Sequence, residues 1–483
     1  MSDDTSTSSL HSLSLLDELD LCMLLLLLNV LEHEVTVLRA NVVAAMDQIR
    51  REELTAQRAK PNTTARRKSF EQIIGVLSPK AFHRMFRMNR DSFDKLCENV
   101  IAKVGACVFK SEEWLISDEA RSTNTATFHA TSALGGTLSG EMKLGIMLRM
   151  LAGASYLDVL LTYGISTASV YAVFHEGTSW IVITFKFPFA QWITSKDEEA
   201  LNRVAEGFSS DSGGIFRKCI GALDGLAVKI KCPATSDLIR DPGNYFCRKG
   251  FYALNVQAIC DKSRRVLWMS SGHKGSTHDS TAFLETQLSK ILDQNSDWLE
   301  SKGNFIVGDS AYPLMGHLLV PYADAKSLSP EDAFNFWLSN SRIQIECAFG
   351  EVVMRWGILW RKLLFDIKDV GKVLRAVVLL HNFLVDERES RSGLNIEDAE
   401  YFRSFSLRDL DDRSLLSNEQ PSAVATDNNK PHPGGRPNGS MINHQERGKR
   451  KREDLTDELY GSGRGRPMQE RMHHNAHGQV YFS

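Results

Sequence analysis

Three acidic residues that lie far apart in the sequence carry the chemistry of this chain. Asp224 interrupts the apolar run Gly221–Ile230, Asp309 ends the run Phe305–Asp309, and Glu346 adjoins the apolar stripe of a helical pattern. A carboxylate in such a place costs several kcal/mol unless another charge compensates it. Two divalent cations would do so, and carboxylate oxygens favour Mg²⁺ or Mn²⁺. These residues therefore predict metal-assisted phosphodiester chemistry, in which paired ions activate the attacking oxygen and stabilise the leaving one.

The elements that must position these acids form an α/β pattern. Short apolar or alternating runs predict strands, and runs with helical spacing predict helices. The residues 261–265 have a length suited to a hairpin between two of the strands. The predicted strands are Cys219–Ile230, Ala253–Cys260, Val266–Ser270 and Asn304–Val307, and the predicted helices are His278–Asp293 and Pro330–Leu364, the latter broken or kinked near Ser339–Arg342.

Changes in composition divide the rest of the chain. Residues 1–68 form a leader with a Leu-rich helix and a basic end, and residues 69–208 form a helical region. Within it, residues 141–182 have the order of a helix-turn-helix. The second helix of this segment, about Ser166–His175, lacks Lys and Arg, which readers of bases or phosphates usually carry. A plain packed bundle therefore remains the alternative to a DNA-reading unit.

Composition excludes several classes of protein. The 483 residues include 57 Lys and Arg against 60 Asp and Glu, for a net charge of −3, so any affinity for nucleic acid must come from local basic patches. The most apolar stretch, Leu21–Leu31, is too short to cross a membrane, which takes roughly 20 residues. The cysteines form no close C-x-x-C pair, so the sequence predicts no cysteine zinc site.

Residues 411–483 predict a disordered tail, because few large apolar residues are present to offset the ordering entropy. The tail carries a basic cluster that resembles a nuclear-import signal: Lys449, Arg450, Lys451 and Arg452. A Gly463–Pro467 segment is similar to the core of an AT-hook, although a solvated linker explains it better. The cluster predicts a nuclear location.

Several motifs together resemble the catalytic core of the PIF/Harbinger transposases. They cover about residues 218–385, and their order and spacing are specific although each alone is weak. The motifs are Ile220–Gly225 with Cys232–Pro233, Asn244–Ala258, Gly275–Ser280, Gly308–Pro313, Ser341–Gly350 and Leu380–Leu384.

The resemblance implies an RNase H-like fold for residues 218–385. Asp224 on the first strand, Asp309 after the fourth strand and Glu346 on a later helix would form the DDE triad that holds two Mg²⁺ or Mn²⁺ ions. The implied reaction is hydrolysis at the ends of a DNA element, followed by attack of the released 3′-hydroxyl on target DNA. The family also implies DNA as substrate and a separate Myb-like DNA-binding partner, and the chain could form a homo-oligomer.

Two other functions remain open. The first is a domesticated DNA-binding or chromatin-associated protein that uses the same fold as a scaffold, and the intact triad weighs against it. The second is a metal enzyme that does not act on nucleic acid, such as a phosphatase, and it explains neither the basic tail nor the motif order.

Candidate phosphate contacts are Arg248, Lys249 and Lys274, although each is equally explained as a solvated surface charge. Arg342 precedes Glu346 by one helical turn and could orient its carboxylate.

Two further motif positions have structural explanations. Asp279 could be an accessory metal ligand, but an acid that caps the following helix is the favoured interpretation. The pair His381–Asn382 is interpreted as a satisfied polar pair beside the core.

Overall fold

The computed structural model describes residues 68–108, 138–211, 214–234, 241–390 and 439–466, with isolated positions at 35–48 and 473–481. The chain divides into two compact units, Met1–Thr64 and Ala65–Ser483, and the fold below is that of the second. The predicted Leu-rich helix of the leader, at Leu21–Leu31, lies outside the described residues.

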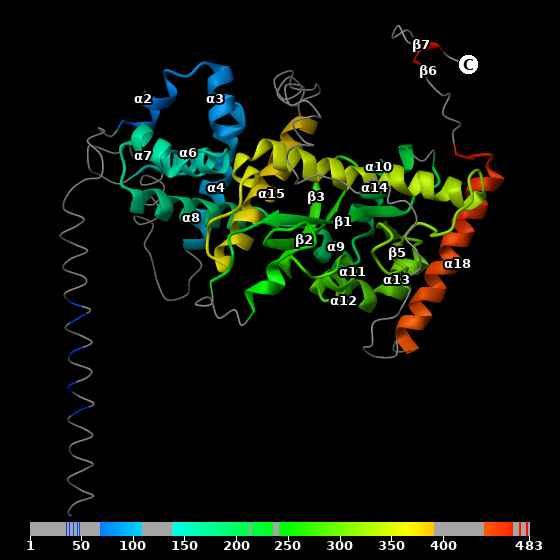
Figure 1. The fold of residues 1–483 in the computed structure, drawn as a ribbon. Coiled ribbons are helices and arrows are strands. Elements are labelled where there is room, and N and C mark those ends of the chain that lie inside the picture. Colours follow the sequence, from blue (N-terminus) through cyan, green and yellow to red (C-terminus); the bar gives the residue numbers. More distant parts are fainter. Residues whose placement is uncertain are drawn as a thin grey trace, which may run out of the picture. The chain divides into compact units, whose positions relative to one another are not determined.

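A five-stranded mixed sheet lies at the centre of the α/β region, residues 214–390 (Figure 1). Its order is β3-β2-β1-β4-β5: β2 pairs antiparallel with both β1 and β3, whereas β4 pairs parallel with β1 and β5 parallel with β4. β2 is buried along its whole length, as expected of a strand near the middle of a covered sheet. The strands are β1 (Cys219–Lys229), β2 (Ala253–Cys260), β3 (Val266–Lys274), β4 (Phe305–Val307) and β5 (Leu318–Leu319).

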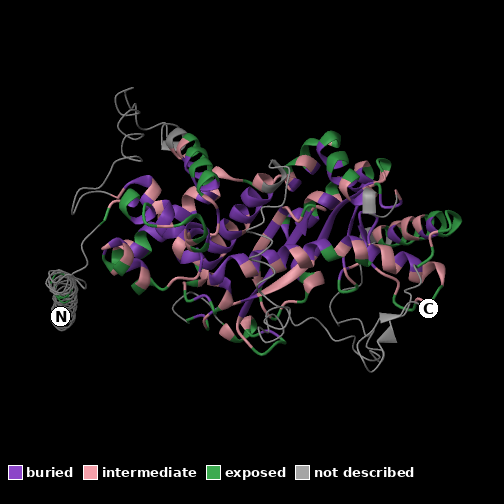
Figure 2. Ribbon diagram, turned by 90° about the horizontal axis from the view of Figure 1, so that it is seen from above, coloured by how far each residue is buried: buried purple, intermediate pink, exposed green. Residues whose placement is uncertain are grey.

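Two long helices, α14 (Pro330–Arg355) and α15 (Ile367–Ser390), cover one face of this sheet. Strand side chains alternate between the faces, so one set of alternate positions meets these helices. The side chains that meet there are Leu226, Val228, Val256 and Ala258 of the sheet, Phe349 and Val352 of α14, and Leu374 and Val377 of α15. Figure 2 shows the strands as mostly buried. The predicted α/β class is confirmed.

Two predicted helices differ from the structure. The segment predicted as one helix is two, α11 (Asp279–Leu284) and α12 (Gln287–Gln294), because the Thr286 hydroxyl accepts a hydrogen bond from the backbone of Ser289 and starts a second helix. The predicted break near Ser339–Arg342 is also wrong. α14 runs on to Arg355, and the chain turns there into η3 (Gly357–Trp360).

The predicted helical region forms eight described helices, several of which start at a serine whose hydroxyl caps the first turn. Gly164, with φ +63°, joins α7 to α8 in the predicted helix-turn-helix order, but α8 extends well beyond the predicted end at His175. The helices are α2 (Phe70–Ile74), α3 (Pro79–Phe86), α4 (Arg90–Val108), α6 (Gly140–Leu151), α7 (Tyr156–Tyr163), α8 (Thr167–Thr184), α9 (Phe189–Ser195) and α10 (Glu198–Asp211).

Among the described residues, no single helix has the length and apolar composition of a membrane span. One pair has them only in combination, Tyr156–Tyr163 with Thr167–Ser195, and it is bent by 102°.

The prediction of disorder for residues 411–483 is wrong where the tail is described as a helix, α18 (Gly439–Gly461). This helix lies beside α14 and β5 (Figure 1) and buries Thr456 and Leu459. It needs no core of its own, because the α/β region supplies the surface on which it docks. Two short paired strands, β6 (His473–His474) and β7 (Val480–Tyr481), follow it.

Candidate functional site

Parallel pairing of β1 with β4 brings two of the predicted acids to the same end of the sheet. Ala222 of β1 lies opposite Val307 of β4, and each aspartate follows two residues later, Asp224 within β1 and Asp309 just past β4. Adjacent strands lie about 4.8 Å apart, so these positions bring the two aspartates close together. Asp309 follows the last residue of β4, so the alternation of the strand does not fix the face on which its side chain lies.

α14 brings the third acid, Glu346, to the face of the sheet that carries Asp224, together with Arg342. The Arg342 guanidinium lies between two acids: its Nη1 is 3.2 Å from Asp224 Oδ2 and its Nη2 is 2.6 Å from Glu346 Oε1. The side chain of Arg342 is 23% exposed, that of Asp224 19% and that of Glu346 31%, so water screens their charges only in part. The predicted contact of Arg342 with Glu346 is present, and the bridge to Asp224 adds a contact that helical spacing could not predict.

Electrostatics make Asp224 the most perturbed acid of the group. Burial raises the pKa of Asp224 to about 7, the nearby Asp309 and Glu346 add to the rise, and Arg342 and a hydrogen bond from the Gly225 backbone oppose it. That hydrogen bond, to Asp224 Oδ1, is 2.7 Å long. The three acids thus form a region of concentrated negative charge that one guanidinium does not neutralise.

A cleft of about 550 Å³ opens on the other face of β1. Gly225, the neighbour of Asp224, lines it, and so does Asp309, which acts on Asp224 electrostatically as well. The predicted phosphate contacts Arg248 and Lys249 line this cleft and are exposed. Lys274 does not line the cleft, but it is exposed at the end of β3, next to Gly275, which does.

A network of buried amides supports the cleft, and the sequence prediction missed it. Gln257 donates to Asp279 Oδ1 at 2.9 Å and to Asn255 Oδ1 at 2.7 Å, and it accepts a 2.6 Å hydrogen bond from the Tyr312 hydroxyl. Asn255 also donates to Asp279 Oδ1, at 2.9 Å. Two amides at alternate positions of an otherwise apolar strand share one face. That spacing was the signal available in the sequence.

Asp279 is the acid at the N-terminus of a helix that the sequence predicted, but it is not the N-cap. The N-cap of α11 is His278, and Asp279 is the first residue of the helix, with its carboxylate turned to the amides of β2. Those amides stabilise a charged side chain near the sheet more strongly than the helix end would alone.

Gly225 is required by the close approach of this network. A Cβ atom there would lie 2.4 Å from Asp279 Oδ1 and 2.7 Å from Gln257 Nε2. We expect Gly225→Ala to lower the free energy of unfolding by about 1–3 kcal/mol, because the hydrogen-bonded side chains cannot move aside without losing partners. Urea denaturation measures this change.

The matched control is Gly272→Ala in β3, where an added Cβ would meet nothing within 4 Å among the described residues. We expect this substitution to change stability by less than about 0.5 kcal/mol. Equal effects of the two substitutions would show that crowding at Gly225 does not matter.

In the polar pair at 381–382, Asn382 is satisfied, as predicted, and His381 makes a polar contact through Nε2. Asn382 exchanges two hydrogen bonds with the backbone of Val266, at 2.8 and 2.7 Å, and His381 Nε2 lies 2.9 Å from the Arg264 carbonyl oxygen. These contacts tie α15 to the start of β3.

The three acids offer the donor atoms of a site for hard divalent cations, but in the described part of the chain they are not among the groups whose donor atoms all lie within 4.8 Å of one another. All their donor atoms are carboxylate oxygens, the ligands that Mg²⁺ and Mn²⁺ prefer. Arg342 already places a positive group between Asp224 and Glu346 and so marks where a cation is stabilised.

Comparisons with known proteins agree with this arrangement. Residues 223–382 match the family model described as DDE superfamily endonuclease, and the match includes Asp224, Asp309 and Glu346. The chain is 24% identical over 338 residues to Protein ALP1-like of Arabidopsis thaliana, an alignment that covers 65% of this chain and 72% of that protein. No solved structure matches the chain significantly. Residues 223–382 thus form a domain similar to the DDE superfamily endonucleases.

Proposed function

We propose that this protein is a metal-dependent DNA endonuclease of the PIF/Harbinger transposase type, which cleaves phosphodiester bonds at element ends and joins the 3′-hydroxyl to target DNA. The observation that carries the proposal is the gathering of Asp224, Asp309 and Glu346 within a domain similar to the DDE endonucleases. A nuclease of this kind needs no nucleophile from the protein.

An RNase H-like core is part of the proposal, and the order of the strands supports it. Three antiparallel strands, β1 to β3, are followed by β4 and β5, which add to the free edge of β1 in the parallel direction. The acids then fall on the first strand, just past the fourth strand and on the later helix α14.

Asp224, Asp309 and Glu346 would hold two Mg²⁺ or Mn²⁺ ions. When bound, such a pair activates the attacking oxygen and stabilises the leaving one. Arg342 keeps Asp224 and Glu346 together before metal binds. A cation has to displace the proton that Asp224 holds below about pH 7, so loading is favoured at higher pH.

The cleft on the other face of β1 is the proposed path of the DNA backbone. Arg248 and Lys249 line it and would contact phosphates, while Asp309 links it to the acids. Lys274, at the exposed end of β3, would extend the same contact along the backbone.

A Myb-like partner would supply sequence recognition. α8 has no Lys or Arg, and the α7–α8 unit exposes apolar and aromatic side chains, namely Tyr156, Leu157, Leu161 and Tyr171. Such a surface suits a protein partner better than a phosphate backbone. Binding of target DNA by residues 138–211 alone, with high sequence specificity, would contradict this part of the proposal.

A nuclear location is proposed from the basic cluster of α18. Lys449 and Arg450 are exposed, whereas Lys451 and Arg452 donate hydrogen bonds to carbonyl oxygens of the α/β region. An import receptor would therefore meet only half of the cluster on the docked helix.

Cleavage of plasmid DNA tests the proposed function. We expect the purified chain to nick and linearise supercoiled DNA with Mg²⁺ or Mn²⁺, to leave 3′-hydroxyl ends, and to lose this activity in EDTA. The activity should elute with the protein in gel filtration, which excludes a contaminating nuclease. Failure to cut under all these conditions would contradict the proposal.

One observation favours a second function, DNA binding without cleavage. Arg342 already bridges Asp224 and Glu346, so the fold does not depend on metal to hold these acids together. Specific DNA binding without nicking in any metal would establish this scaffold role.

A further inference from the structure

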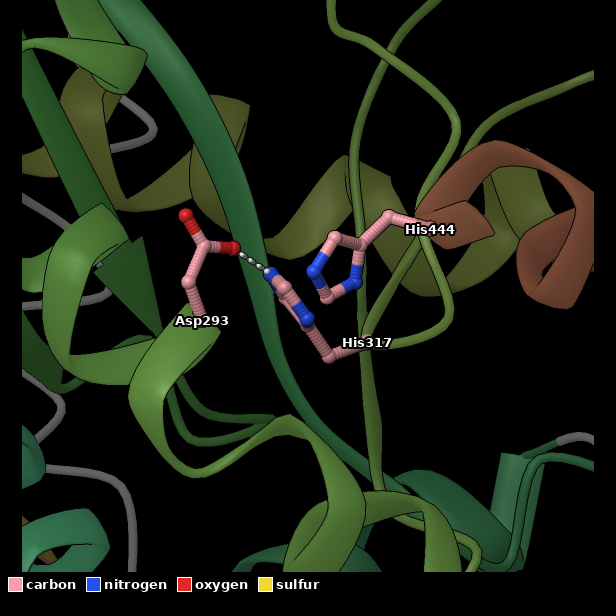
Figure 3. Close-up of side chains that lie close together, drawn as sticks. All are labelled: Asp293, His317 and His444. Carbon is pink, nitrogen blue, oxygen red and sulfur yellow. Dashed lines mark ion pairs between the residues drawn. The ribbon is translucent and has the colours of Figure 1, made fainter. Parts of the chain in front are cut away.

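A second cluster of side chains of metal-binding types lies away from the three acids, where α18 meets the α/β region. It consists of Asp293 from α12, His317 just before β5 and His444 from α18 (Figure 3). One donor atom from each residue lies within 4.8 Å of the other two. The three residues are far apart in the sequence, so only the docking of α18 completes the group.

His317 is the buried centre of this cluster. Its side chain is 1% exposed, and within the described part of the chain neither ring nitrogen has a hydrogen-bond partner. The same holds for Asp293 Oδ1 and His444 Nδ1, whose atoms are also buried. Figure 3 shows the Asp293 carboxylate and the His444 ring beside the His317 ring. Buried polar atoms without partners are rare, and here they gather at one point.

An ion pair does not account for the cluster. His317 Nε2 lies 3.8 Å from Asp293 Oδ1, which is too long for a hydrogen bond. Burial, together with the nearby His444 and Lys451, lowers the pKa of His317 to about 3, so the ring is neutral at physiological pH. A neutral imidazole is the form that binds metal ions.

We propose that Asp293, His317 and His444 bind one zinc ion, or a chemically similar transition-metal cation, that fastens α18 to the α/β region. Two imidazoles and one carboxylate suit zinc, whereas Mg²⁺ prefers oxygen ligands alone. Zinc–ligand bonds of about 2.0–2.2 Å place tetrahedral ligand atoms roughly 3.4 Å apart, so small side-chain rotations would close the group. A water molecule completes the tetrahedron.

The contacts around the cluster explain why a fastener is useful there. α18 is otherwise held at this end mainly by polar contacts: Arg447 lies 2.7 Å from Asp297 Oδ1, and Lys451 donates to the carbonyl oxygens of Asn304 and Gly316 at 3.0 and 3.3 Å. Salt weakens the exposed Arg447 pair, whereas a metal bridge withstands salt. The bridge would also keep Lys451 in its buried position.

Metal titration of the full chain tests the inference. The protein is stripped with a chelator, exchanged into buffer with excess Mg²⁺ to occupy the carboxylate site, and titrated with Co²⁺ or Zn²⁺. We expect one tightly bound equivalent per chain, the strong visible absorption of tetrahedral Co²⁺, and slower amide hydrogen exchange in residues 439–448 on binding.

His444→Ala should lower the affinity for zinc by at least about tenfold and abolish the gain in exchange protection. Asp293→Asn, at a half-exposed position, should do the same and guards against a folding defect in either variant. Gln445→Ala, an exposed neighbour on α18, is the matched control and should bind like the unmodified chain. Absence of a bound equivalent, or equal binding by His444→Ala and the control, would overturn the proposal, and neither result depends on DNA cleavage.

Discussion

Asp224→Asn is expected to reduce DNA cleavage by roughly 10³-fold or more, because loss of a metal ligand forfeits several kcal/mol of transition-state stabilisation. Asp224 is the acid that the sheet holds most rigidly, within β1, and Asn has the same shape without the charge. Initial rates of plasmid nicking in Mn²⁺ measure the loss. Binding of DNA without metal should change little.

The same substitution should change how stability depends on pH. The pKa of Asp224 in the folded protein is about 7, above the ordinary value of 3.8, so the folded state binds more protons than the unfolded state between these limits. Metal-free stability therefore falls as pH rises from about 4 to 7 and stays low above that range. Asp224→Asn removes this decline, and we expect the variant to be at least as stable as the unmodified protein at pH 8.

Asp366→Asn is the matched control for both effects. Asp366 pairs with Lys231 at 2.7 Å, but its side chain is 51% exposed. We expect full cleavage and little change in stability from its substitution. Cleavage that survives Asp224→Asn would remove this acid from the proposed site, and an unchanged pH profile of stability would show that its pKa is not raised.

The strands of the sheet were predictable because buried strands consist largely of apolar residues, and such runs are visible in the sequence. β2 begins and ends where the pattern does, at Ala253 and Cys260. β3 runs four residues beyond its predicted end at Ser270, up to Lys274. Those last residues are polar and partly exposed, and backbone pairing with β2, such as Leu254 opposite Lys274, makes them a strand. Such pairing leaves no mark in the segment itself.

α18 was not predictable from its own residues for a related reason. Its composition is polar, and its docking uses carbonyl oxygens of other segments: Lys451 contacts Asn304 and Gly316, and Arg452 contacts Val320 and Pro321. The information that specifies the helix therefore lies on the surface of the α/β region, more than 130 residues earlier in the sequence.

The candidate site was predictable to the extent that each residue stands out locally. A carboxylate in an apolar strand or at a strand end is visible in the sequence, and so is the one-turn spacing of Arg342 and Glu346. The bridge from Arg342 to Asp224 spans 118 residues and depends on where α14 crosses β1. The sequence therefore identified the acids and the pairing of Arg342 with Glu346, but not the contact of Arg342 with Asp224.

Removal of the Arg342 guanidinium is expected to raise the affinity for metal and to lower the stability of the metal-free protein. In the unmodified protein, the Arg342 guanidinium opposes the negative charges of Asp224, Asp309 and Glu346 and lowers the pKa of Asp224. Arg342→Gln removes this opposing charge. We expect the metal-free protein to lose about 1–3 kcal/mol at pH 8, because the pairs are only partly exposed to solvent. Mn²⁺ no longer competes with a built-in positive group, so the Mn²⁺ concentration for half-maximal binding should fall about tenfold.

Arg90→Gln is the matched control, because Arg90 also pairs with an acid one helical turn away, Asp94, but on an exposed surface of α4. It should change stability by less than about 0.5 kcal/mol and leave metal binding unaltered. If Arg342 instead orients the acids in the metal-loaded site, half-maximal Mn²⁺ binding would require a higher concentration in Arg342→Gln. The direction of this shift therefore decides whether Arg342 occupies the place of a cation or supports its ligands.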